Sequence, residues 1–327
     1  MFFNLMIIST LITISSYSWF SMWIGLEINL LSIIPIFKSN LNYFPAEATI
    51  KYFITQTLAS IFILFTIILL INTNELMFKI NNYYLMLILN SSLLTKLGAA
   101  PFHSWFPEVS EGLNWMNNLI LMTWQKIAPS ILLMYNININ FFIYIIILSS
   151  LVSGIYGLNQ TSLRKILAYS SINHISWMLA SMFFNKTIWI NYFMIYTIIS
   201  INIIMIFSYF NIFNISQMSL IFKSNKIMNL LLMMNFFSLG GLPPFLGFYP
   251  KWLTLNLLIY NNFYFISLIL VLLTLMTLYF YTRLMFSSLT LITNESLLNL
   301  KFNNKLLIIL NLIVLMSLPI SMNLYNF

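Results

Sequence analysis

Long runs of apolar residues, separated by short polar breaks, follow one another along almost the whole chain. An α-helix needs about 20 such residues to cross a hydrocarbon core ~30 Å thick. The pattern therefore predicts an all-α polytopic membrane protein with about 11 transmembrane helices. The expected helices span residues 2–20, 22–37, 49–72, 82–104, 112–135, 140–158, 163–184, 187–212, 227–248, 259–286 and 305–325.

Basic residues are distributed unevenly between the two sides that these helices define. The side of the N-terminus collects most of them: Lys38, Lys51, Arg164, Lys165, Lys223, Lys226, Arg283, Lys301 and Lys305. The other side has Lys79 and Lys186. Loops on the cytoplasmic or matrix side carry the excess of Lys and Arg. We therefore expect the N-terminus on that side and, after an odd number of crossings, the C-terminus on the opposite side.

Two similar segments interrupt the fourth and the ninth expected helix. PFHSWFP begins at Pro101 and PFLGFYP begins 143 residues later at Pro244, and both follow the pattern P-F-x-x-aromatic-aromatic-P. Proline removes a backbone donor, and in a membrane the carbonyls that it frees must be met by protein or water. Interrupted helices at corresponding positions of two halves are typical of inverted-repeat transporters. In a chain with 30 Phe, a pattern this loose can also arise by chance.

This repeat predicts the organisation of the chain. Residues 1–135 would form a first five-helix repeat, and residues 136–286 a second five-helix repeat of opposite topology. Residues 287–327 would supply a loop and a C-terminal transmembrane helix.

Four charged residues fall inside the expected helices, although charged residues make up only 6% of the chain. They are Glu27, Lys96, Lys126 and, at the second interruption, Lys251. A charge at the bilayer centre costs at least ~2.5–3.5 kcal/mol, so four would cost on the order of 10 kcal/mol, comparable with the stability of a domain. This cost indicates function. The simpler explanations are that each lysine snorkels to an interface and that Glu27 forms a structural ion pair.

These residues suit proton transfer without a cofactor. A carboxylate paired with a buried lysine keeps the lysine charged, and breaking the pair lets desolvation disfavour the ammonium form and release a proton. His103 and His174 are the chain's two histidines and titrate near neutrality, so they are possible relays. Alternatively, His103 satisfies carbonyls freed by the prolines, and His174 belongs to an interhelical hydrogen-bond cluster with neighbouring Ser and Asn.

Composition narrows the chemistry further. The chain has no Cys, so disulfides and thiolate sites are excluded, and its six acidic residues are all Glu, so we expect no metal or haem centre. The net charge of +8 comes from cations scattered singly between apolar runs, and we expect no nucleic acid as partner. The N-terminus has neither a basic region with a cleavage site nor an Arg-rich presequence, and we expect it to be the first spanning helix. The abundance of Asn, Ile, Phe and Met fits an AT-rich coding sequence, either of an organellar genome or of an AT-rich bacterium.

Six segments together resemble one family. They are WIGLEINLLSIIP, EATIKYFITQTLAS, KLGAAPFHSWFPEV, TWQKIAP, GLNQTSLRKILAYSSINH and LGGLPPFLGFYPKW, in this order between about residues 20 and 285. They are similar to the antiporter-like subunits in the membrane arm of respiratory complex I, the mitochondrial NADH:ubiquinone oxidoreductase. The resemblance implies two inverted five-helix repeats in a multi-pass protein of the inner mitochondrial membrane, with its N-terminus in the matrix and its C-terminus in the intermembrane space.

The resemblance also implies roles for individual residues. Glu27 matches the glutamate of an ion pair, Lys96 its partner on the first broken helix, Lys126 the central lysine and Lys251 the lysine of the second broken helix. His103 and His174 match positions on the same polar axis. The chain itself would hold no cofactor, because NADH, FMN, iron–sulfur clusters and ubiquinone bind elsewhere in the complex. Its partners would be lipids and other membrane-arm subunits, including neighbouring antiporter-like and small hydrophobic ones.

Two other functions remain open at this point: a subunit of a cation/proton antiporter, which would share the fold and the lysines, and a purely structural membrane subunit. Four intramembrane charges favour the first two functions over the third, because a scaffold does not need them.

Overall fold

The computed structural model describes residues 1–38, 43–73, 79–218, 226–289 and 311–312 of the 327-residue chain. Apart from residues 311–312, the expected C-terminal helix 305–325 lies outside this part. The described residues are almost entirely helical, with one isolated β-bridge between Ser162 and Asn214. The chain divides into two compact units, Met1–Ile145 and Ile146–Phe327.

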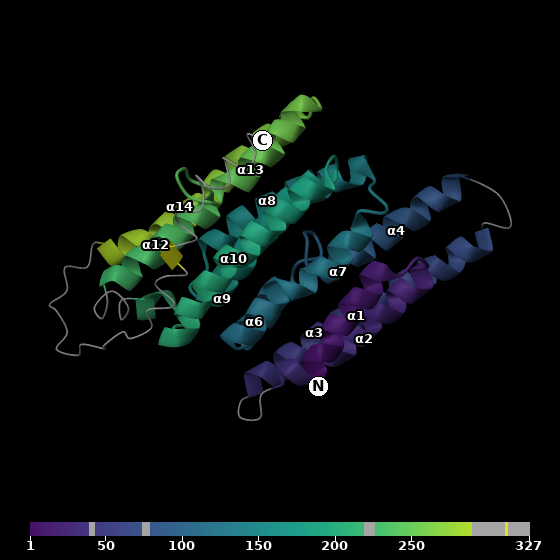
Figure 1. The fold of residues 1–327 in the computed structure, drawn as a ribbon, viewed down its shortest axis with the longest axis horizontal. Coiled ribbons are helices and arrows are strands. Elements are labelled where there is room, and N and C mark those ends of the chain that lie inside the picture. Colours follow the sequence, from purple (N-terminus) through teal and green to yellow (C-terminus); the bar gives the residue numbers. More distant parts are fainter. Residues whose placement is uncertain (39–42, 74–78, 219–225, 290–310, 313–327) are drawn as a thin grey trace. The chain divides into compact units, whose positions relative to one another are not determined.

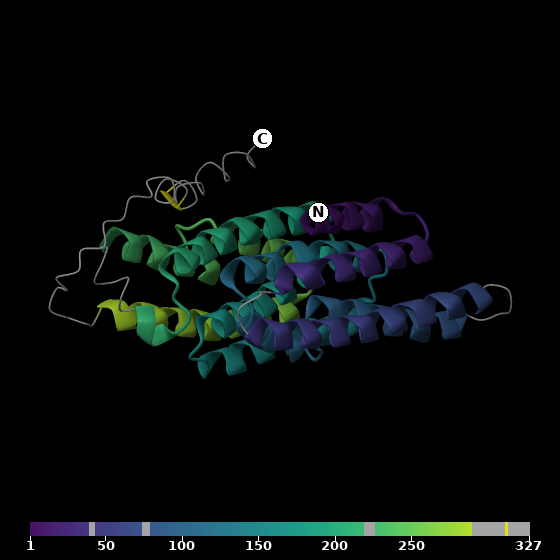
Figure 2. The same ribbon diagram turned by 90° about the horizontal axis from the view of Figure 1, so that it is seen from below.

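Seven helices of the first unit carry or surround the candidates Glu27, Lys96 and Lys126. They are α1 (Phe2–Ser15), α2 (Trp19–Phe37), α3 (Tyr43–Thr73), α4 (Lys79–Leu97), α5 (Trp105–Gly112), α6 (Trp115–Met122) and α7 (Trp124–Leu133). The helices α1 and α2 form a hairpin, and α3 lies beside α4 (Figures 1 and 2). The α7 helix packs on α4, and α5 packs on α3. These contacts bring residues from α2, α3, α4 and α7 to one place.

The α8 helix (Ile139–Leu158) leads into the second unit. It is followed by α9 (Leu163–Met182), α10 (Lys186–Phe210), the short 3₁₀ helix η1 (Ile215–Gln217), α12 (Lys226–Gly240), α13 (Phe248–Tyr260) and α14 (Tyr264–Leu289). The α9 helix is buried along almost its whole length and contacts α10, α13 and α14. Its polar residues are therefore buried against protein. Figure 1 shows α9 beside α10.

The fold is that of an all-helical membrane protein, as the sequence predicted. Within the described residues, five helices are long and apolar enough to cross a membrane: Trp19–Phe37, Phe44–Ile71, Ile139–Leu158, Lys186–Phe210 and Tyr264–Phe286. Large apolar side chains such as Phe53, Phe62 and Phe65 on α3 are exposed. In a membrane protein such surfaces face lipid, which is as apolar as the side chains themselves.

Several expected helices are shorter than predicted or are divided. The first ends at Ser15, the fourth at Leu97 and the ninth at Gly240. The fifth, expected as 112–135, consists of α6 and α7, with Thr123 between them. Thr123 Oγ1 donates to the carbonyl of Leu119, and Pro129 inside α7 has no N–H to offer the preceding turn. Hydropathy alone does not register such local hydrogen-bond competition.

Candidate functional site

The two helix interruptions share the same backbone geometry. The glycine that ends each helix has a positive φ, 76° at Gly98 and 78° at Gly241, a conformation that glycine adopts without steric cost. In both, the glycine N–H bonds to the carbonyls three and four positions earlier, and the next N–H returns to the carbonyl five positions earlier. This is a Schellman-type ending, which satisfies the last carbonyls of a helix.

The likeness continues beyond the glycines. A cis peptide bond precedes Pro101 in the first interruption and Pro244 in the second. The chain then resumes helix at Trp105 in α5 and at Phe248 in α13. The two segments that share a sequence pattern therefore also share the way the helix ends and the point at which helix resumes, at the same spacing.

Lys96 lies in the last turn of α4, directly before the first interruption, and only 7% of it is exposed. It lines a small cavity together with Leu26, Asn29, Leu30, Tyr52, Gln56, Gln125 and Pro129. Glu27 lies half-buried on α2 and acts electrostatically on Lys96. Within the described residues, the two form no direct ion pair, and the Oε1 atom of Glu27 is buried without a hydrogen-bond partner. The pair expected from the sequence is thus separated in this conformation.

An amide network that sequence reasoning did not identify forms one wall of this cavity. Asn29 Nδ2 donates to Gln125 Oε1 at 3.2 Å, and Gln125 Nε2 donates back to Asn29 Oδ1 at 3.2 Å. The hydroxyl of Tyr52 donates to the same Gln125 Oε1 at 3.3 Å. These residues come from α2, α7 and α3, so the network ties three helices together beside Lys96.

Lys126 is the residue after Gln125 and lies in the first turn of α7, 2% exposed. Its Nζ lies 5.5 Å from the centre of the Phe106 ring, which belongs to α5. A cation over an aromatic face is stabilised by the negative face of the ring. The Trp105 indole N–H donates to Thr95 O at 3.0 Å and so attaches α5 to the last turn of α4. The first interruption thereby contributes directly to the surroundings of Lys126.

Lys251 lies in the first turn of α13, 6% exposed, and its ammonium reaches back across the second interruption. It donates to Leu239 O at 3.1 Å and to Gly240 O at 2.8 Å, the last carbonyls of α12. It also lies 5.8 Å from the centre of the Trp177 ring. A cation at the C-terminus of a helix is stabilised by the helix dipole. In this conformation Lys251 is a helix cap directed inward and does not snorkel to an interface.

His174 is buried on α9 among aromatic hydroxyls. Its Nδ1 lies 2.9 Å from the hydroxyl oxygen of Tyr192, and the ring of Tyr196 lies 5.0 Å away, centre to centre. These three side chains line a second small cavity. The other residues that line it are Ile195, Ile199, Ser238, Gly247 and Pro250. The histidine therefore shares a cavity with Gly247 of the second interruption and with Pro250, the residue before Lys251.

His103 is partly exposed within the first interruption. Its Nδ1 lies 3.3 Å from the carbonyl oxygen of Pro101. This is the kind of contact that the structural alternative requires, in which the imidazole satisfies the backbone around the prolines. The geometry does not place His103 in the wall of the Lys96 cavity.

Comparison with known proteins identifies the family. A family model described as "NADH:quinone oxidoreductase/Mrp antiporter, TM" matches residues 16–277. The protein named NADH-ubiquinone oxidoreductase chain 2 of Anopheles gambiae is 49% identical over 93% of this chain and 90% of the relative. Proteins of the same name from Locusta migratoria and Elephas maximus are each 41% identical, over 97% and 90% of this chain and 93% and 87% of their own lengths. The chain belongs to the NADH-ubiquinone oxidoreductase chain 2 family.

Solved structures agree on the fold of this chain 2 family member. A chain of respiratory complex I from Thermus thermophilus matches with a TM-score of 0.84 and 20% identity, over 96% of this chain and 78% of that chain. A chain of the Mrp complex from Dietzia matches with a TM-score of 0.79 and 12% identity, over 98% and 74%. The resemblance inferred from the sequence segments is confirmed.

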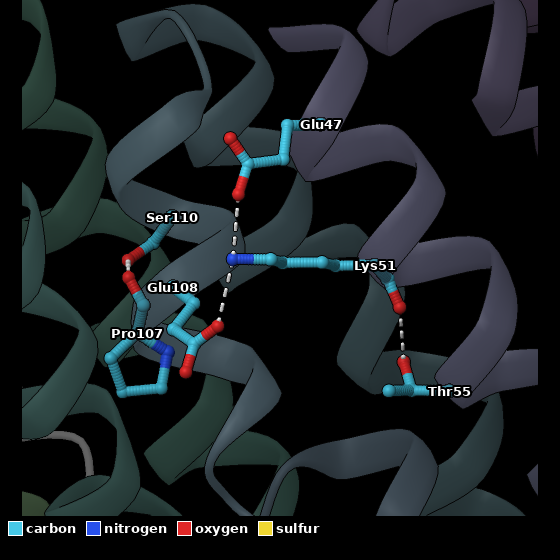
Figure 3. A network of polar contacts seen from close by, with 6 residues as sticks. All are labelled: Glu47, Lys51, Thr55, Pro107, Glu108 and Ser110. Atoms are coloured by element: carbon cyan, nitrogen blue, oxygen red, sulfur yellow. Dashed lines mark hydrogen bonds and ion pairs between the residues drawn. The ribbon is translucent and has the colours of Figure 1, made fainter. Parts of the chain in front are cut away.

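An ion-pair network on the surface of this chain 2 family member was also not foreseen. Lys51 on α3 extends between Glu47, one turn away, and Glu108 in the first turn of α5 (Figure 3). Its Nζ lies 2.9 Å from Glu47 Oε1 and 3.0 Å from Glu108 Oε2. The lysine side chain is 42% exposed and the two glutamates more so, so water and salt screen these ion pairs and they contribute little to stability. The sequence indicated Lys51 only as one of the basic residues on the side of the N-terminus.

Proposed function

We propose that this chain translocates protons across the inner mitochondrial membrane as a core subunit of the membrane arm of respiratory complex I. As a chain 2 family member it is a subunit of NADH:ubiquinone oxidoreductase. The energy comes from NADH-to-ubiquinone electron transfer in other subunits. Protons pass along an axis of Glu27, Lys96, Lys126 and Lys251, with His103 and His174 as possible relays.

One observation carries the proposal: each buried lysine of the axis lies at a helix interruption. Lys96 ends α4, Lys126 begins α7 after Thr123, and Lys251 caps α12 from the start of α13. Helix ends leave backbone groups without helical partners, and within a membrane such irregular backbone occurs where it is buried in protein or lines a hydrated cavity. Such positions support the proposal, because a hydrated cavity at a helix end would give protons access to a buried lysine.

Proton movement follows from changes of pairing. In this proposal Lys96 holds its proton when it is paired with Glu27 and releases it when the pair separates. Lys251 has backbone carbonyls as partners instead, so displacement from the end of α12 would have the same effect. His174, held by Tyr192, offers an imidazole beside the second interruption.

The inverted-repeat organisation of 1–135 and 136–286, followed by 287–327, is part of the proposal. It is supported by spacing. The starts of α3 and α10, the ends of α4 and α12, and the starts of α5 and α13 are each separated by the same 143 residues as Pro101 and Pro244. We further propose eleven transmembrane helices, with the N-terminus in the matrix and the C-terminus in the intermembrane space, as the basic residues indicate.

Partners and cofactors follow from the same assignment. The chain contacts other membrane-arm subunits and lipids, and it leaves NADH, FMN, the iron–sulfur clusters and ubiquinone to the rest of the complex. Within the described residues, no group of three or more His, Cys, Asp or Glu side chains could hold a metal ion.

The test replaces charges of the axis in assembled complex I. We expect Lys96→Met and Glu27→Gln to lower the number of protons moved per electron in proteoliposomes, while Lys51→Met, which removes an exposed lysine of the same unit, does not. An unchanged proton-to-electron ratio in both axis variants would show that these residues are not the path.

A cation/proton antiporter subunit is the second candidate, because a chain of the Mrp complex has the same fold. Partners distinguish the two functions. Co-migration of this chain with NADH dehydrogenase activity on a native gel supports complex I, and its recovery only in complexes without that activity supports the antiporter.

A further inference from the structure

The amide network beside Lys96 is placed where it can control water. Gln125 and Asn29 use their amide groups on each other, and Tyr52 occupies the remaining lone pair of Gln125 Oε1. Asn29 and Tyr52 are 4% and 3% exposed, so water outside the protein does not compete for these bonds. With the pair closed, these bonds engage one N–H of each amide, both lone pairs of Gln125 Oε1 and one lone pair of Asn29 Oδ1, so the wall offers a water molecule in the Lys96 cavity fewer partners than an open pair would.

Opening the pair would change the cavity. An amide side chain has two donors and an acceptor with two lone pairs, so separating Asn29 from Gln125 exposes several groups that need new partners. In a buried polar space these partners are ordered waters. Lys96 already faces this space and makes no hydrogen bond with a described residue, so the same waters would solvate its ammonium.

Gln125 also lies where α7 is least constrained. It is the second residue after the interruption at Thr123, and Pro129 has no N–H to bond to its carbonyl. A small rotation of this turn moves the Gln125 side chain away from Asn29. The same turn carries Lys126 as the next residue, so the hydrated space would then extend from Lys96 toward Lys126.

We propose that the Asn29–Gln125 amide pair, braced by Tyr52, is a latch that controls hydration of the Lys96 cavity and thereby proton transfer between Lys96 and Lys126. The inference rests on the proposed proton path. In the transfer, one N–H bond breaks at the lysine that is an ammonium and one forms at the lysine that is a neutral amine, and intervening waters pass the proton. The amides orient these waters and are not themselves protonated, so Gln125, Asn29 and Tyr52 are positioning residues.

The central experiment measures protons moved per electron by assembled complex I in proteoliposomes. Gln125→Leu replaces the polar wall by an apolar one, and we expect the ratio to fall to the value of Lys96→Met. The exchange Asn29→Gln with Gln125→Asn keeps one long and one short amide facing each other, and we expect it to recover most of the loss that either single substitution causes. Recovery of this kind is not expected from the loss of packing alone.

Asn90→Leu is the matched control. Asn90 is a fully buried amide on α4 that donates to Asn136 O at 2.8 Å and does not line the cavity. Its replacement is expected to lower the yield of assembled complex without changing the ratio. If Gln125→Leu behaves in the same way, the latch is wrong while the proton path stands. If Lys96→Met and Glu27→Gln both leave the ratio unchanged, the proposed function fails, and the latch fails with it.

Tyr52→Phe provides an independent measurement should the Gln125 variants not assemble. It removes one brace and leaves the amide pair in place, so the latch should open more often. We expect a faster passive proton leak in proteoliposomes whose complex is inhibited at the quinone step. A leak equal to that of the unaltered complex overturns the proposal.

Discussion

Gly241→Ala tests how tightly the second interruption holds Lys251. A Cβ at position 241 would lie 2.7 Å from Lys251 Cδ and 3.1 Å from Nζ. Carbon atoms pack at ~3.5–4.0 Å, so the lysine side chain must withdraw by roughly 1 Å. That movement takes the ammonium away from carbonyl oxygens that it now reaches at 2.8 and 3.1 Å.

The cost has two parts. An alanine at a φ of 78° costs about 1–2 kcal/mol, and a lost hydrogen bond from a charged group about 1.5–3 kcal/mol. The sum of about 2.5–5 kcal/mol is a large fraction of the ~5–15 kcal/mol that stabilises a typical domain. We therefore expect a complex that assembles but dissociates at a lower temperature and moves fewer protons per electron.

Two neighbouring substitutions separate these parts. Gly98→Ala introduces alanine at nearly the same φ, 76°, but its Cβ meets Phe106 at 3.1 Å and not the lysine. At Gly240, on the same helix end, the nearest atom would be Leu278 at an ordinary 3.7 Å. The measurements are thermal dissociation on native gels and the proton-to-electron ratio. Gly98→Ala should lower only the dissociation temperature, Gly241→Ala should lower both the dissociation temperature and the ratio, and Gly240→Ala should change neither. If Gly241→Ala matched Gly240→Ala in both measurements, the cap on α12 would not matter.

Two further predictions concern the surface and the second cavity. Lys51→Met breaks two exposed ion pairs and should change the thermal dissociation of the complex only slightly, with the change vanishing at high salt. A large, salt-independent loss of stability would mean that the network is buried against a partner. Tyr192→Phe removes the hydroxyl 2.9 Å from His174 Nδ1, at a cost to stability of about 0.5–1.5 kcal/mol, and should alter the pH profile of coupled turnover; an identical profile would argue against His174 as a relay.

The sequence was informative where a residue type dictates the backbone. Gly98 and Gly241 end their helices because few other residues adopt their φ, and the prolines that follow mark the interruptions without any knowledge of packing. The buried lysines were equally visible, because a charge in an apolar run is costly wherever the helix lies. These local signals located both interruptions and three candidate proton carriers.

Contacts between distant segments could not be read in this way. Asn29 and Gln125 are 96 positions apart, and nothing in WIGLEINLL or TWQKIAP shows that the two amides meet. Likewise, Glu27 was expected to form an ion pair with Lys96, but whether the two side chains meet depends on how α2 and α4 pack, which the sequence does not show. A signal was available for Gln125 alone: an uncharged polar residue beside a buried lysine, in an apolar helix, needs a partner.

Each interruption has a lysine at the C-terminal end of its first helix, but the two lysines come from different positions in the chain. Lys96 belongs to the helix before its interruption, and the position 143 residues later is Leu239, whose carbonyl accepts a hydrogen bond from Lys251. Lys251 belongs to the helix after its interruption, and the matching position in the first is Glu108. Position 170, which corresponds to Glu27, is Ser. The second interruption therefore has no glutamate at that position to pair with Lys251. The carbonyl end of α12 is the partner of the lysine instead, and it carries a negative partial charge of roughly half an electron. In the proposed proton path, Lys251 would lose its partner only by moving, because a helix end cannot be protonated. An ion pair between Lys96 and Glu27 would also break when Glu27 takes up a proton.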